Sequence, residues 1–254
     1  MQNKVNFKRI NAIDEPDLLT ISDKIVEKLW PEFMLHDEVA NQYWERLFID
    51  FPEYQFILID NANDEIIATA NSIPINWTKP LNQLPDKGWD WALELGMNQF
   101  ECKTSPNIQC ALSITVSKQY VGKGISTLVI SEMASVGKSK GFKNLIAPVR
   151  PNHKGRYPLI SMTDYIKWDN GEGLPFDPWL RVHTRIGGKI INVCHKAMKI
   201  QGSIKNWEQW SNMKFPQSGN YIIPGALSPV QLDIDKNTGR YIEPNVWMCH
   251  DLIS

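Results

Sequence analysis

Apolar side chains near the start of the chain recur at two spacings, one typical of strands and the other of helices. Residues 7–12 form a short apolar-rich run, which predicts a strand. Two later stripes repeat every three or four residues, as on one face of a helix: Leu18, Ile21, Ile25 and Leu29, then Val39, Tyr43, Trp44, Leu47 and Phe48. Pro31 is expected to break or bend the first helix, because proline removes a backbone donor. The chain is therefore expected to begin with a strand and two helices.

The next apolar segments predict a hairpin followed by alternating helices and strands. Two strand-like runs flank the polar turn 61–65, whose Asn and Asp residues tolerate left-handed backbone. After them we expect a helix, a strand, a second helix and a further strand. In chain order the six segments are 54–60, 66–75, 88–98, 108–116, 125–140 and 144–149.

The C-terminal part, residues 166–254, is dense in Trp, Pro and Gly and predicts a strand over 189–200 and a short helix over 207–213. A closing hairpin is expected at 231–249. Because no low-complexity linker or repeat separates this part from residues 1–165, we expect a core over 1–165 and an extension that completes the same sheet. A separate interaction domain is the alternative.

The loop between the strand 108–116 and the helix 125–140 is the main candidate binding site. Gly122 and Gly124 let the backbone approach a ligand without Cβ atoms in the way. The following helix directs its first unpaired N–H groups and the positive end of its dipole at the same place. This geometry is suited to a diphosphate, although neither a P-loop nor a dinucleotide fingerprint is present.

Gln119, Gly122 and Gly124 reproduce the signature of motif A of the GNAT superfamily of N-acetyltransferases, which this segment resembles. The resemblance implies an α/β (α+β) fold in which helices flank a mixed central sheet and a C-terminal β-rich region completes that sheet. It also implies acetyl-CoA, or another acyl-CoA, as cofactor, bound by the core over residues 1–165, with residues 166–254 as a wall of the acceptor pocket. The positions carried over as cofactor contacts are Ile114, Thr115, Val116, Gln119, Tyr120, Val121, Gly122, Lys123, Gly124, Ile125, Ser126 and Asn152.

Composition narrows the class of protein. The net charge is −1 and no block of Lys or Arg occurs, which argues against a partner bound through its phosphates, such as a nucleic acid. No basic-plus-apolar leader and no apolar run of about 18 residues is present, which predicts no membrane association and a cytoplasmic location. The four cysteines lack metal-site spacing, so we expect free thiols and no metal.

Candidate catalytic residues follow from the chemistry of acyl transfer. An amine with a pKa near 10.4 must lose its proton to attack a thioester, at a cost of roughly 4.6 kcal/mol at pH 7. The strand 108–116 contains no carboxylate, so a protein base must lie elsewhere. His153 and His183 are candidates for that base. By resemblance, Tyr157 or Tyr165 would protonate the departing thiolate, although Pro158 disturbs the expected helix.

A second resemblance concerns residues 150–159 and 177–183, which are similar to the GNAT-like acyltransferase domains of polyketide loading modules. That family implies decarboxylation of malonyl-CoA and transfer of acetyl to a carrier-protein thiol. Thr115 and one of His153 or His183 would then orient the malonyl group. This alternative accounts for the missing carboxylate.

Three functions therefore remain open: an N-acetyltransferase acting on an amine, a decarboxylating S-acyltransferase, and a non-catalytic acyl-CoA sensor. The acceptor would be a small molecule or a carrier protein, and a homodimer is allowed. Among the tryptophans, Trp77, Trp89 and Trp91 are expected to line the acceptor pocket by their order in the chain. Trp30 and Trp44 are expected to pack in the core.

Overall fold

The computed structural model describes residues 6–26 and 29–253. Its N-terminal elements follow the expected order of one strand, two helices and a hairpin, with a 3₁₀ helix between the two helices. Their bounds are β1 Phe7–Asn11, α1 Leu18–Val26, the 3₁₀ helix Glu32–His36, α2 Glu38–Asp50, β2 Gln55–Asp60 and β3 Ile66–Ile75. Leu29 was expected in the first helix and lies beyond it, in a turn before Pro31.

The central elements contain two strands whose bounds, like those of β3, match the sequence expectation residue for residue. These strands are β4 Ile108–Val116 and β5 Asn144–Val149. Helix α4 Ile125–Ser139 joins them, and α3 Gly88–Glu101 stands between β3 and β4. Polar residues flank both runs, Asn107 and Ser117 for β4 and Lys143 and Arg150 for β5, and they mark where each strand ends.

The C-terminal part contains the expected long strands and three short elements that the sequence patterns did not predict. The expected elements are β6 Lys189–Gly202, α7 Ile204–Ser211, β8 Val230–Asp233 and β9 Thr238–Asp251. The unexpected ones are α5 Met162–Tyr165, α6 Pro178–Arg185 and β7 Gly219–Tyr221. Helix α6 begins at an Asp177 side chain that accepts from the N–H groups of Trp179 and Leu180, with Pro178 in its first turn.

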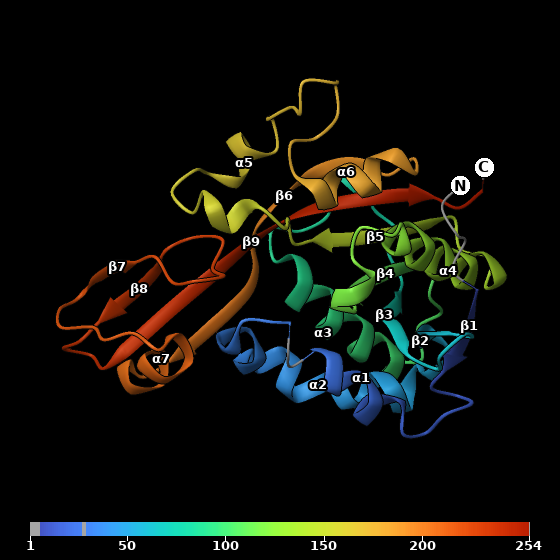
Figure 1. The fold of residues 1–254 in the computed structure, drawn as a ribbon, viewed down its shortest axis with the longest axis horizontal. Coiled ribbons are helices and arrows are strands. Elements are labelled where there is room, and N and C mark those ends of the chain that lie inside the picture. Colours follow the sequence, from blue (N-terminus) through green and yellow to red (C-terminus); the bar gives the residue numbers. More distant parts are fainter. Residues whose placement is uncertain (1–5, 27–28, 254) are drawn as a thin grey trace.

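The strands of the described residues form one nine-stranded sheet in the order β1-β2-β3-β4-β5-β9-β8-β7, with β6 also paired to β9. Strands from the C-terminal part therefore join the sheet of the N-terminal part, as expected. Helices α1, α2 and α3 lie on one face, whereas α4 and α6 lie on the other (Figure 1). The long pair β6 and β9 extends beyond the helical layers and carries α7, β7 and β8 (Figure 1).

Strands β4 and β5 diverge soon after they meet, and this divergence positions the site. They run parallel and pair only at Gln109–Leu145 and Cys110–Ile146. Beyond that point β4 continues against β3 up to Val116, while β5 continues against β9. The carboxyl ends of β4 and β5 therefore form no hydrogen bonds with each other. The backbone edge of β4 that faces β5 is open to a ligand there.

A bulge in β4 lies at the point of divergence. The pairing with β3 shifts between Asn71 and Ser72, so Leu112 has no partner on β3. Its carbonyl oxygen instead accepts a hydrogen bond of 2.8 Å from Nε1 of Trp89 on α3. The bulge turns the side chain of Thr115 toward the face that carries α1, α2 and α3, where it lies opposite Thr69.

No helix in the described part of the chain is long and apolar enough to cross a membrane.

Candidate functional site

The loop before α4 has the backbone geometry expected of an anion site. Gly122 and Gly124 have φ angles of 82° and 77°, in the left-handed region that favours glycine. A Cβ atom added at either position would meet no protein atom within 4 Å, so the space in front of them is open. Helix α4 has no side-chain cap and no acidic residue in its first turn. Its first N–H groups, including those of Ile125 and Ser126, are available to a diphosphate.

Two side chains of this loop hold it in place rather than pointing into the open space. Gln119 donates a hydrogen bond from Nε2 to Glu65 at 2.5 Å, and the Tyr120 hydroxyl donates to Asp60 at 2.9 Å. Asp60 is the last residue of β2, and Glu65 lies in the turn between β2 and β3. The side chains of Gln119 and Tyr120 therefore orient the loop, while those of Val121 and Lys123 are exposed.

The end of β4 carries a hydroxyl held by a tryptophan. Thr115 is buried, and its Oγ1 accepts a hydrogen bond of 3.2 Å from Nε1 of Trp30. The guanidinium carbon of Arg150, which directly follows β5, lies 6.0 Å from the centre of the Trp30 ring. Trp30 thus connects the carboxyl ends of the two diverging strands, and it also packs against the hydrophobic core, as expected.

Replacing Thr115 with valine is expected to lower the free energy of unfolding by about 1–2 kcal/mol. The change keeps the shape but leaves the partly buried N–H of Trp30 without an acceptor. Thr127→Val, at an exposed position on α4, is the matched control and should change stability by less than about 0.5 kcal/mol. Chemical denaturation measures both. Equal effects would show that the Trp30 hydrogen bond contributes nothing.

Arg150 also forms an ion pair with a carboxylate buried in β9. Its Nε lies 3.0 Å from both carboxylate oxygens of Glu243, which is fully buried, and the Tyr241 hydroxyl donates to the same carboxylate at 2.9 Å. Burial raises the pKa of Glu243, and the guanidinium of Arg150 opposes that rise. The arginine further donates to the carbonyl oxygen of Gly225. The negative charge of Glu243 is therefore already paired with the positive charge of Arg150.

Two more carboxyl groups, Asp37 and Asp90, lie on the same face of the sheet. Asp37 precedes α2 and is fully buried; its Oδ1 accepts from the N–H of Ala40 at 2.8 Å. Asp90, on α3, accepts with Oδ2 from the N–H of Lys199 at 3.0 Å. The other oxygen of each is buried and has no hydrogen-bond donor among the described residues. The strand β4 has no carboxyl group, but the residue before α2, helix α3 and strand β9 each supply one.

The sequence patterns missed these three acids for an identifiable reason. Asp37 reads as an ordinary helix cap, and Asp90 as an acidic residue in the first turn of a helix. Glu243 carried the only available signal, because it interrupts an apolar strand, where an unpaired charge would be costly. That signal indicates that Glu243 has a buried partner, but it does not identify the residue that pairs with it.

The segment after β5 is organised around Asp177 rather than around Thr115. The backbone N–H groups of Asn152 and His153 donate to Asp177, as does the Tyr165 hydroxyl at 2.8 Å. Burial and this carboxylate raise the pKa of Tyr165. Tyr157 packs edge-on against Trp168 and Phe176 and tilted against Tyr165. The contacts of Asn152, His153, Tyr157 and Tyr165 thus position this segment, and none of these contacts links it to Thr115.

His183 lies on the far face of the sheet from the three acids. Its Nδ1 is 2.8 Å from Nε2 of His250, which pairs with Leu145 in the register of β5 and β9. Gln109 of β4 also pairs with Leu145, so His250 lies level with Gln109, six residues before Thr115. Six residues of a strand span roughly 20 Å. The structure therefore does not bring His183 together with Thr115, and we assign His183 no catalytic role.

The buried histidine pair predicts a loss of stability in mild acid. Burial, and secondarily His250, lower the pKa of His183 to about 3. Below pH 6.5 the unfolded chain takes up a proton that the folded chain refuses, so stability falls as the pH falls. Between pH 7.5 and 5 the wild type should lose about 2 kcal/mol relative to His183→Gln.

Urea denaturation at both pH values measures that difference in the free energy of unfolding. His195→Gln, at an exposed position of β6, is the control and should follow the wild type. Parallel pH profiles for wild type and His183→Gln would contradict the prediction.

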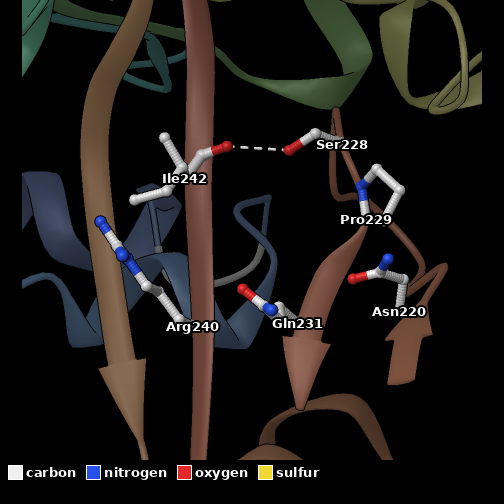
Figure 2. Close-up of a pocket in the computed structure, with 6 residues that line it drawn as sticks. All are labelled: Asn220, Ser228, Pro229, Gln231, Arg240 and Ile242. Atoms are coloured by element: carbon white, nitrogen blue, oxygen red, sulfur yellow. Dashed lines mark hydrogen bonds between the residues drawn. The ribbon is translucent and has the colours of Figure 1, made fainter.

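A surface cavity of about 370 Å³ lies elsewhere, on the arm formed by β7, β8 and β9. Figure 2 shows it lined by Asn220, Ser228, Pro229, Gln231, Arg240 and Ile242. Arg240 and Ile242 alternate along β9 with Tyr241 and Glu243, so the cavity opens on the opposite face of this strand from Glu243. It is separate from both the glycine loop and the acidic residues.

Comparison with known proteins identifies the family. No protein-family model matches the chain. Arginine N-acetyltransferase avaD of Aspergillus versicolor is 30% identical to this chain. The alignment covers 89% of this chain and 87% of that protein. The chain belongs to the GNAT superfamily of N-acetyltransferases. The family resemblance, the enzyme class and acetyl transfer expected from motif A are thereby confirmed.

Solved structures confirm the fold of this acetyltransferase. The loading GNAT-like domain of CurA from Lyngbya majuscula superposes with a TM-score of 0.61 at 19% identity, covering 98% of each chain. The GphF GNAT-like decarboxylase in complex with isobutyryl-CoA gives 0.59 at 14% identity, covering 97% of this chain and 99% of the other. An aminoglycoside 6'-N-acetyltransferase complexed with coenzyme A gives 0.50 at 13% identity, covering 98% of each.

Proposed function

We propose that this acetyltransferase moves the acetyl group of acetyl-CoA to a nitrogen of arginine or of a small arginine-like cation. The observation that carries the proposal is the divergence of β4 and β5, which has the uncapped start of α4 nearby and three acidic residues on one face. The name of the avaD relative supports arginine as the acceptor.

The glycine loop fits the diphosphate of coenzyme A. Open space in front of Gly122 and Gly124, together with the free N–H groups of the first turn of α4, matches what a diphosphate needs. Acetyl-CoA supplies the thioester whose acetyl group is transferred. The unpaired edge of β4, including Ile114, Thr115 and Val116, would bind along the pantetheine arm. Neighbours with bound CoA or isobutyryl-CoA support this cofactor.

The acceptor would enter from the face that carries Asp37, Asp90 and Glu243. Trp30 and Trp89 stand at the ends of this region, bonded to Thr115 and to the carbonyl of Leu112. The hydrogen bond from Trp30 would orient the hydroxyl of Thr115. Residues 166–254 contribute Glu243 to this face, which supports their role as a wall of the acceptor pocket.

An acceptor assay tests the proposal. Purified protein is incubated with acetyl-CoA and L-arginine, released thiol is measured, and mass spectrometry locates the acetyl group on the product. The expected result is arginine-dependent release of CoA with acetyl on nitrogen. In a parallel incubation with malonyl-CoA, carbon dioxide released without any N-acetylated product would instead indicate the decarboxylating function. Binding of acetyl-CoA without turnover of any amine would indicate a sensor.

A further inference from the structure

We infer that Asp37 and Asp90 together form a binding site for the guanidinium group of the acceptor, so that the enzyme selects a cation over a neutral molecule of the same shape. The inference deepens the proposed function and rests on it for the identity of the acceptor. It concerns recognition, and it assigns these two residues no part in the transfer step.

Each aspartate has one oxygen used by the fold and one left over. Asp37 is fully buried, and its Oδ1 caps α2 through the N–H of Ala40, but its Oδ2 has no donor among the described residues. In Asp90 the N–H of Lys199 occupies Oδ2, and the buried Oδ1 is equally without a donor. A buried carboxylate oxygen without a partner is costly, and a ligand cation would remove that cost.

Glu243, on the same face, differs from the two aspartates because both of its carboxylate oxygens have hydrogen-bond donors. Both of its oxygens accept from Arg150, and Tyr241 donates to one of them. Within the described ranges no ion pair of this kind reaches Asp37 or Asp90. Asn245, two residues along the same face of β9 and 1% exposed, presents a third acceptor, Oδ1, that has no donor there either.

Contacts of Trp89 and Asn245 link α3 and β9, which flank the two aspartates, to the diverging strands. Trp89, adjacent to Asp90, donates to the carbonyl of Leu112 at the bulge where β4 leaves β5. Asn245 donates from Nδ2 to the carbonyl of Pro148 on β5, at 3.2 Å. Trp89 also stacks on Trp44 of α2, with ring centroids 6.1 Å apart, which brings α2 and α3 together. Trp89, next to Asp90 on α3, and Asn245 of β9 are therefore bonded directly to the diverging strands.

The charges around the two aspartates favour a cation. Burial, and after it the negative charge of Asp37, raise the pKa of Asp90 to about 9, while burial raises the pKa of Asp37 to about 6. Glu38, Glu94 and Glu243 add negative charge. A positive group placed between the two carboxyls would offset both burial and repulsion. A metal ion is a weaker candidate, because no three metal-ligating side chains converge among the described residues.

A guanidinium matches this arrangement better than an ammonium. It is planar, carries five N–H donors in a fixed fork, and is less strongly hydrated, so it enters a buried site at lower cost. Carboxylates are its preferred partners. The acceptors offered here come from three elements, α2, α3 and β9, which suits a flat group with donors along several edges.

Direct binding measurements test the inference without relying on turnover. L-Arginine and L-citrulline, its neutral isostere, are titrated calorimetrically at pH 8 into the wild type, Asp37→Asn, Asp90→Asn and the exposed control Glu45→Gln, with and without CoA. Asparagine keeps the oxygen that accepts from Ala40 or Lys199, so both variants should retain their folds, which thermal unfolding checks. Each aspartate variant should bind L-arginine at least about tenfold more weakly. Glu45→Gln should match the wild type, and citrulline should bind weakly throughout.

The outcomes separate the inference from the proposed function. Unchanged arginine affinity in both folded aspartate variants, equal binding of citrulline and arginine, or no arginine binding by the wild type would each overturn the inference. If unchanged affinity accompanies normal arginine acetylation, the proposed function stands and the cation site does not. Arginine binding that depends on both aspartates, in a protein that acetylates no amine, would keep the cation site and overturn the proposed function.

Discussion

Gly124→Glu is expected to abolish measurable binding of acetyl-CoA while the protein remains folded. Gly124 is the residue before α4, with a φ angle of 77° and open space where a side chain would point. A glutamate there would place a carboxylate in front of the first N–H groups of the helix, which are the groups proposed to hold the diphosphate. Steric and electrostatic effects act together, so Kd should rise by more than about 100-fold, or roughly 2.7 kcal/mol. Calorimetric titration measures it.

Gly141→Glu is the matched control for this prediction. Gly141 follows the other end of α4, has a φ angle of 76° and also has open space around it, so the two substitutions strain the backbone to a similar degree. It should lower stability comparably and leave acetyl-CoA binding unchanged. If folded Gly124→Glu binds acetyl-CoA as the control does, the loop is only a turn and the proposed cofactor site is wrong.

Arg150→Met is expected to lower the free energy of unfolding by about 3–5 kcal/mol at pH 8. The substitution preserves most of the side-chain volume but leaves Glu243, which is fully buried, without its cation. The pKa of Glu243, already raised by burial, should rise further once the guanidinium is gone. Because a carboxyl with a raised pKa in the folded state costs stability only when it is ionised, the loss should shrink as the pH falls. Denaturant unfolding at pH 8 and pH 5 measures this.

Two further variants make the Arg150 prediction specific. Arg9→Met removes a partly exposed pair with Glu132 and should cost less than about 1 kcal/mol. The double variant Arg150→Met with Glu243→Gln removes both charges and should recover much of the lost stability, since no ionised group is left buried. A double variant no more stable than Arg150→Met would mean that packing, rather than the unpaired charge, causes the loss.

The sequence predicted the elements of the fold best where apolar runs end at glycine or polar residues. Strands β3, β4 and β5 were placed to the residue, and the hairpin of β8 and β9 was expected from its turn. Helix α6 was missed because its eight residues are too few to show a repeating stripe, although Asp177 and Pro178 mark its start. Its amphipathic pattern is clear only once its bounds are known.

The candidate site was less predictable because it depends on tertiary pairing. The glycine loop could be found from spacing alone, since one segment contains all of its parts. His183 was a candidate because of its sequence neighbours, whereas the register of β4, β5 and β9 places it on the far face. Asp37 and Asp90 are 53 positions apart, and only the packing of α2 against α3 makes them neighbours.

The position of β9 in the chain has a consequence for how the enzyme matures on the ribosome. This strand emerges after every other described strand, yet it inserts between β5 and β8 and also pairs with β6. Until it is synthesised, β5 lacks its antiparallel neighbour, and Arg150 has no Glu243 to bind. The nascent chain can form the local hairpin of β2 and β3 early, but its acidic face is completed last. A chain halted before β9 would therefore expose an unpaired edge of β5 to aggregation, and its acidic face would lack Glu243 and Asn245.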